Sequence, residues 1–185
     1  PTLGNSLVMD YLGQTGLDAL KGADILKTAP AKYHSTVEYG DNPIAQNLQG
    51  IAKVLLANMG TRVFNTQHIG YDTHASQAPF HVKLWTDLSQ AITDFFEDLQ
   101  QHHSSENVIM FIFTEFGRRV RDNGAGTDHG SGGVALVIGD AIHGGMYSEY
   151  PSLKEEDLLE GDLHFNFDYR GLYGTLAERW LNLDP

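Results

Sequence analysis

The chain has 185 residues, of which 41 % are hydrophobic and 19 % charged, and its formal net charge is −12. This length and composition predict one globular domain, residues 1–185, with a sizeable core. The negative charge argues against nucleic acid as a partner, since phosphates attract a basic face, and against an anionic membrane surface. The absence of cysteine excludes disulfides, thiolate nucleophiles and zinc sites built from Cys.

The start of the chain and its apolar runs bear on export and membrane insertion. No apolar run is long enough to span a bilayer, so we expect no membrane insertion. The chain begins with Pro1 and shows no signal peptide. We therefore expect a processed chain or the C-terminal part of a longer one, from which any targeting segment has been removed.

Helical patterns dominate the first half of the chain. Asn42 and Pro43 form a strong helix start, because Asn caps the first turn and Pro suits the first helical position. Gly60 is the expected end of that helix. The expected elements, in chain order, are a loose helix over residues 1–28, a loop over 29–41, a helix over 43–59, a short strand over 61–66, a loop over 67–78 and a helix that opens at Pro79.

Strand patterns dominate the second half. Residues 108–113 and 134–138 are continuous apolar runs, which are typical of strands covered on both faces in a parallel sheet. Residues 163–169 alternate between apolar and polar side chains, as in a half-buried strand. An amphipathic helix over residues 172–181 closes the chain. This order of elements predicts an α/β sandwich with a mostly parallel central sheet.

The first chemically suggestive motif contains Asp72 and His74. It lies between a predicted strand and a predicted helix, where the carboxyl end of the strand would place it among ligand-binding loops. Residues two apart on an extended chain point the same way, so both side chains could face one metal ion. The alternative is that Asp72 only turns the loop. His81, in the following helix, could support such a site or simply pack.

The second motif is Thr114-Glu115-Phe116-Gly117-Arg118. We expect Glu115 at the end of a buried strand, where its carboxylate must be paired, protonated or bound to metal. Glu115 could therefore be a metal ligand, a general base or the partner of a nearby arginine. Arg118 could form that salt bridge, or it could hold a phosphate or sulfate group through its guanidinium.

The third motif is Asp128-His129, which lies between glycines. Adjacent side chains on an extended chain diverge, so both would serve one site only if the backbone turned, which the glycines permit. Asp and His together suit zinc or manganese, although a hydrogen bond between them could simply shape the loop. With the other motifs, this pair predicts one or two divalent ions, Zn or Mn. Two ions ~4 Å apart would clamp a transferring phosphoryl or sulfuryl group.

Three segments together resemble a known bacterial family. They are G-Y-D-T-H-A-S-Q at residues 70–77, T-E-F-G-R at 114–118 and G-T-D-H-G at 126–130, with a helix between the first two. They are similar to the domain-of-unknown-function family DUF1501, which is regarded as a branch of the alkaline phosphatase and sulfatase superfamily. The resemblance runs from about residue 61 to the end and includes G-D-A-I-H-G-G-M-Y and D-Y-R-G-L-Y.

The resemblance has implications for fold, ligands and location. It implies a three-layer α/β sandwich of the alkaline phosphatase type, with a mostly parallel central sheet. Asp72 and His74 would correspond to one set of metal ligands, and Glu115 or Asp128, with His129, to the others. Members are often exported by the twin-arginine route, which implies a periplasmic or extracellular location. Superfamily enzymes carry their nucleophile after a first strand that has no counterpart here, so an N-terminal segment is missing or does not exist.

These observations lead to one main hypothesis and its alternatives. The main hypothesis is a metal-dependent hydrolase of phosphate or sulfate esters, acting on a small anionic ester or a sulfated or phosphorylated saccharide. Glu115 would be a ligand or general base, and Arg118 would bind the anion. The alternative is a catalytically silent metal-binding or structural protein. A third hypothesis is a carbohydrate-related surface factor. A separate N-terminal segment or a second copy of the chain could complete the sheet.

Overall fold

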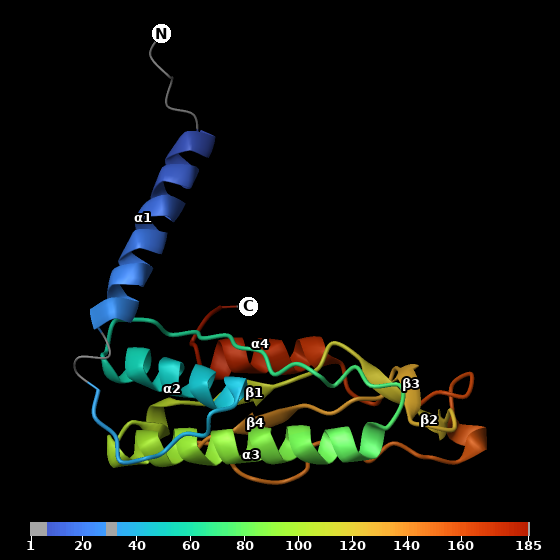
Figure 1. Ribbon diagram of the computed structural model, residues 1–185. Helices are drawn as coiled ribbons and strands as arrows, with labels where there is room; N and C mark the ends of the chain where they lie inside the picture. Colours follow the sequence, from blue (N-terminus) through green and yellow to red (C-terminus); the bar gives the residue numbers. More distant parts are fainter. Residues whose placement is uncertain (1–6, 29–32, 185) are drawn as a thin grey trace. The chain divides into compact units, whose positions relative to one another are not determined.

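The computed structural model describes residues 7–28 and 33–184 (Figure 1). The chain divides into two compact units, which are described separately. Unit 1 comprises Pro1–Ile69 and Lys83–Ser105, and unit 2 comprises Gly70–Val82 and Glu106–Pro185. The predicted metal ligands Asp72, His74, Asp128 and His129 therefore all belong to unit 2.

Unit 1 is helical and holds the buried apolar side chains. It contains α1 (Leu7–Thr28), α2 (Pro43–Leu56) and most of α3 (Gln77–Gln101). The helix start predicted at Asn42 is confirmed, since its side chain accepts a hydrogen bond from the Ala45 N–H and Pro43 opens the helix. Over the described residues, the buried hydrophobic side chains all come from α2 and α3: Ile44, Ala45, Leu48, Ala52, Val54, Leu88, Ala91, Phe95 and Leu99.

The helix α1 confirms the helical pattern expected near the start of the chain. Several of its described apolar side chains are exposed; Tyr11 and Leu20, for example, have 73 % and 65 % of their surface accessible. A search of the described helices found none long and apolar enough to cross a membrane. The helix α3 begins at Gln77, two residues before the expected start, so that Pro79 lies in its first turn, where proline is tolerated.

Unit 2 contains two small antiparallel sheets and a helix. Strand β1 (Met110–Ile112) pairs with β4 (Leu136–Ile138), and β2 (Gly117–Asp122) pairs with β3 (Thr127–Gly130). The helix α4 (Tyr169–Arg179) follows a stretch that includes a short 3₁₀ helix, Glu155–Asp157. Tyr173 of α4 packs edge-on against Phe111 of β1, with ring centroids 5.1 Å apart.

The predicted three-layer sandwich with a mostly parallel central sheet is wrong, because the described strands form only these two antiparallel pairs. Parallel neighbours need a crossover connection, usually a helix. Between β1 and β4 the chain instead forms the β2–β3 hairpin and returns antiparallel to β1. The prediction that both apolar runs are covered on both faces was also wrong, since Phe113 and Val134 are 50 % and 69 % exposed.

Two further predicted strands are absent from the described part of the chain. Residues 61–66 have no regular structure, and residues 163–167 are irregular as well. The alternating pattern in the second segment stops because Asp168 caps α4, accepting a hydrogen bond from the Arg170 N–H. The helix consequently starts at Tyr169, three residues before the predicted position.

Candidate metal centre

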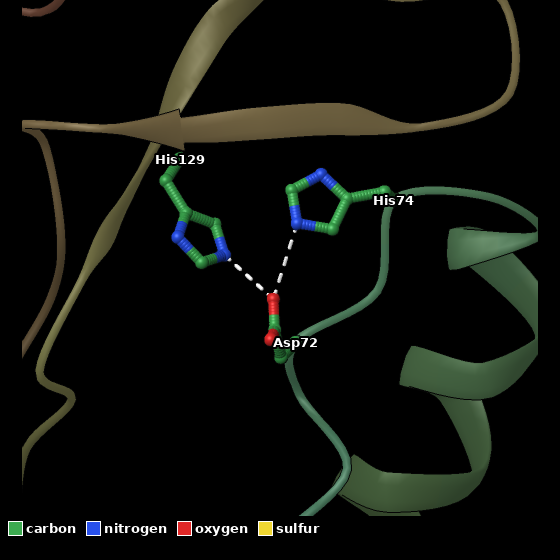
Figure 2. Close-up of side chains that lie close together, drawn as sticks. All are labelled: Asp72, His74 and His129. Atoms are coloured by element: carbon green, nitrogen blue, oxygen red, sulfur yellow. Dashed lines mark hydrogen bonds and ion pairs between the residues drawn. The ribbon is translucent and has the colours of Figure 1, made fainter.

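The structure brings Asp72, His74 and His129 together on the surface of unit 2. One potential ligand atom from each residue lies within 4.8 Å of the others. Nε2 of His129 is 2.7 Å from Oδ1 of Asp72, and Nε2 of His74 is 3.2 Å from the same oxygen. Figure 2 shows this carboxylate oxygen in contact with both rings, whose centroids are 4.8 Å apart. Residues more than fifty positions apart in the sequence thus converge on one oxygen.

Asp72 and His74 reach the site from the loop that precedes α3. The side chains of Asp72 and His74, two positions apart, contact each other as expected. The side chain of Thr73, between them, contacts His81 instead. The Thr73 hydroxyl is 3.1 Å from Nε2 of His81, and its backbone N–H donates to the carbonyl of Tyr71. His81, on the first turns of α3, therefore contacts the loop that carries Asp72 and His74.

His129 reaches the site from strand β3, where it lies opposite Arg118 of β2. The ring of Phe116 stacks on the His129 imidazole, with centroids 3.9 Å apart and planes 12° apart, which limits its rotation. Glycine is required where the hairpin packs closely. A Cβ atom on Gly117 would lie 2.0 Å from the carbonyl oxygen of Gly132, and one on Gly130 would lie 2.5 Å from Asp162. Glycine at these two positions therefore allows the neighbouring segments to approach closely.

Asp128 contacts the other side of His74. Its Oδ1 lies 3.2 Å from Nδ1 of His74 and accepts a hydrogen bond from the Asn123 amide at 2.9 Å. Asp128 and His129 need no turn between them, because they contact different members of the cluster. A carboxylate on the far nitrogen of an imidazole is the usual support of a metal-binding histidine. Asp128 thus contacts the ring nitrogen of His74 that does not contact Asp72. The ligand atoms of Asp72, His74 and His129 lie close to one another.

Hydrogen bonding keeps both aspartates in the charged form. The pKa of Asp72 is lowered, first by the hydrogen bond from His129 and further by the nearby His74. The pKa of Asp128 is lowered mainly by the Asn123 amide and then by His74. Both carboxylates are therefore anionic at neutral pH. Each nitrogen of His74 lies 3.2 Å from a carboxylate oxygen, Nδ1 from Asp128 and Nε2 from Asp72.

Glu115 and Arg118, the other predicted site residues, have different surroundings. Strand β1 ends at Ile112, and Glu115 lies exposed at a bend outside the three-residue group. Its carboxylate therefore does not need the partner that a buried strand end would require. Arg118 donates to the backbone carbonyls of Thr127 and Tyr71, at 2.5 and 2.6 Å.

Asn123 is the contributor that sequence reasoning missed. Its side-chain amide supports Asp128, and its side-chain oxygen accepts from the backbone N–H groups of Ala125 and Gly126. Asn123 thus shapes the β2–β3 turn and supports Asp128 beside the candidate metal centre. Asn-Gly is a strong signal for a tight hairpin turn, and Asn123-Gly124 could have revealed this hairpin.

The donor set fits a divalent metal. Two imidazole nitrogens and one carboxylate oxygen are the ligands of many catalytic zinc sites, which keep a further position open for water or substrate. Oxygen and imidazole ligands also suit manganese. The side chains of Asp72, His74 and His129 are 67 %, 50 % and 41 % exposed, so a small molecule can reach the cluster.

The searches of curated proteins and of solved structures found no match. The family described as "Protein of unknown function (DUF1501)" matches residues 16–184, which include every residue of the candidate metal centre. The chain therefore belongs to the DUF1501 family.

Proposed function

We propose that this protein is a metal-dependent hydrolase of phosphate or sulfate esters, with Asp72, His74 and His129 as the metal ligands. The proposal depends on one observation: Nε2 atoms of two histidines lie within 3.2 Å of one exposed carboxylate oxygen. The choice of ester comes from the expected relation of the DUF1501 family to the alkaline phosphatase and sulfatase superfamily. Zinc and manganese are the expected ions.

A divalent ion bound here would polarise an ester oxygen or activate a water molecule. The surrounding residues keep the ligands ready. With an ion bound, Asp128 would accept a hydrogen bond from Nδ1 of His74 and leave Nε2 for the metal, and the ring of Phe116 stacks on the imidazole of His129. Asp72 supplies the negative charge of the ligand set.

The net charge of the chain gives the ion a second role. A protein with a formal charge of −12 repels anions. A phosphate or sulfate ester therefore needs local positive charge, and a divalent ion at the cluster would supply it. Small anionic esters and sulfated or phosphorylated saccharides are the proposed substrates, and a periplasmic or extracellular location is the proposed setting.

Metal binding and turnover together test this function. Purified protein should bind zinc or manganese stoichiometrically in calorimetry, and should hydrolyse an aryl phosphate or an aryl sulfate in a reaction that a chelator stops. Replacing His129 with alanine should weaken binding, whereas replacing His164, an exposed histidine elsewhere in unit 2, should not. Protein that binds neither ion and turns over neither ester contradicts the proposal. Binding without turnover favours a catalytically silent metal-binding protein.

A further inference from the structure

Arg118 connects the two segments that carry the metal centre. Its two terminal guanidinium nitrogens donate to the carbonyls of Tyr71 and Thr127. Tyr71 directly precedes Asp72, and Thr127 directly precedes Asp128. One half-buried side chain therefore fixes the backbone next to one proposed ligand and next to the carboxylate that supports another.

Arg118 also acts on the third part of the cluster through an aromatic ring. Its guanidinium carbon lies 5.2 Å from the centroid of the Phe116 ring, within the range of a cation–π interaction. Phe116 in turn stacks on the imidazole of His129. The three contacts of Arg118 thus lead to Asp72, to Asp128, which contacts His74, and to His129.

We propose that Arg118 is a positioning residue that sets the spacing of the metal ligands by tying the loop before α3 to strand β3. The inference rests on the proposed function only in that the cluster binds metal. This positioning role differs from the role expected from the sequence, in which Arg118 binds the anion. Both terminal nitrogens already donate to backbone carbonyls, and Phe116 lies against the cation.

The chemistry of the side chain explains why arginine occupies this position. A planar guanidinium presents several N–H groups in a rigid fork, so it can hold two carbonyls at a fixed separation. The ammonium group of lysine is a compact charge on a flexible stem and cannot reproduce that geometry. Lysine would retain the positive charge and lose the fixed spacing, which separates positioning from electrostatic attraction.

The test compares Arg118→Lys and Arg118→Gln with the wild-type protein. Zinc affinity should fall about 10- to 100-fold in both variants, the usual effect of removing groups that orient metal ligands. Arg121→Lys, an exposed change on the same strand, is the matched control and should retain wild-type affinity. Unchanged zinc affinity in both Arg118 variants would overturn the proposal. Unchanged affinity with lost ester turnover would assign Arg118 to anion binding instead.

A second measurement is independent of metal and of catalysis. In the metal-free wild-type protein, the imidazole protons of His74 and His129 should show a nuclear Overhauser contact, because the ring centroids are 4.8 Å apart. The contact should weaken or disappear in Arg118→Gln and persist in Arg121→Lys. If the wild type binds no metal, this measurement still decides the role of Arg118. A contact that persists unchanged in Arg118→Gln would contradict positioning even then.

Discussion

Each unit of the protein contains a cluster of carboxylate and imidazole groups, and the two clusters differ in exposure and in their donors. Asp98 in unit 1 is fully buried, and its Oδ2 accepts hydrogen bonds from the hydroxyls of Tyr33 and Tyr39 at 2.5 and 2.9 Å. Asp72 in unit 2 is largely exposed and faces two imidazole nitrogens. Tyrosine hydroxyls that satisfy a buried carboxylate stabilise structure, whereas exposed imidazoles can exchange a proton for a metal ion.

The histidine of the buried cluster is held by the backbone as well. Nδ1 of His102 is 2.8 Å from the carbonyl oxygen of Asp98 and 3.4 Å from its Oδ1, and Nε2 is 2.8 Å from the carbonyl of His34. Both ring nitrogens therefore face acceptors inside the protein. His74 has exposed neighbours that can rearrange around an ion. The same residue types thus form a structural connection in one unit and a proposed ligand set in the other.

Removing the buried carboxylate should have the largest effect. Asp98→Ala leaves the hydroxyls of Tyr33 and Tyr39 without their acceptor and should lower the free energy of unfolding by about 3 kcal/mol. Chemical denaturation measures this loss. Glu97→Ala, an exposed change on the same helix, should alter stability by less than about 0.5 kcal/mol. Equal stability in the two variants would remove the structural interpretation of the buried cluster.

Removing the exposed carboxylate of Asp72 should affect metal binding much more than stability. Asp72→Ala should weaken zinc binding about 100-fold or more, because a ligand and its charge are lost. The stability of the metal-free protein should change by less than about 0.5 kcal/mol, since the side chain is exposed. Calorimetry and denaturation measure the two quantities. A large loss of metal-free stability with unchanged zinc affinity would make this cluster structural too.

Asp128→Asn should have a smaller effect than the loss of Asp72. The substitution removes the negative charge behind His74, and zinc affinity should fall about 10-fold, as expected for a supporting carboxylate. Asp157→Asn changes an exposed carboxylate that accepts from the Ser152 hydroxyl and is the matched control. An effect as large as that of Asp72→Ala would show that Asp128 binds the metal directly.

Local chemistry in the sequence was sufficient to nominate the members of the exposed cluster. The spacing of Asp72 and His74 and the pair Asp128-His129 were recognisable without a structure. Their division of roles was not, because it depends on contacts such as Arg118 with Tyr71, which are 47 positions apart. The DUF1501 resemblance covered this whole unit and grouped Asp72 with His74, but it did not indicate that His129 contacts Asp72.

The fold shows the same division between local and long-range information. The cap formed by Asn42 and Pro43 was predictable, because capping involves neighbouring residues. The partners of the strands were not, because an apolar run does not specify its neighbour. The Asn123-Gly124 turn was the local signal that favoured a hairpin between the two runs, and with it the antiparallel return of β4.

Alkaline pH should reveal the buried cluster through its tyrosines. Burial and the hydrogen bond to Asp98 raise the pKa of Tyr33 from 10.0 to about 12, and the same causes raise the pKa of Tyr39. A folded-state pKa above the unfolded one stabilises the fold fully below pH 10.0, and this contribution is lost as pH rises toward about 12. Tyr33→Phe/Tyr39→Phe should lose stability less steeply over this window, by denaturation at stepped pH. Tyr150→Phe, an exposed change, should follow the wild type, and identical curves for all three proteins would contradict the assignment.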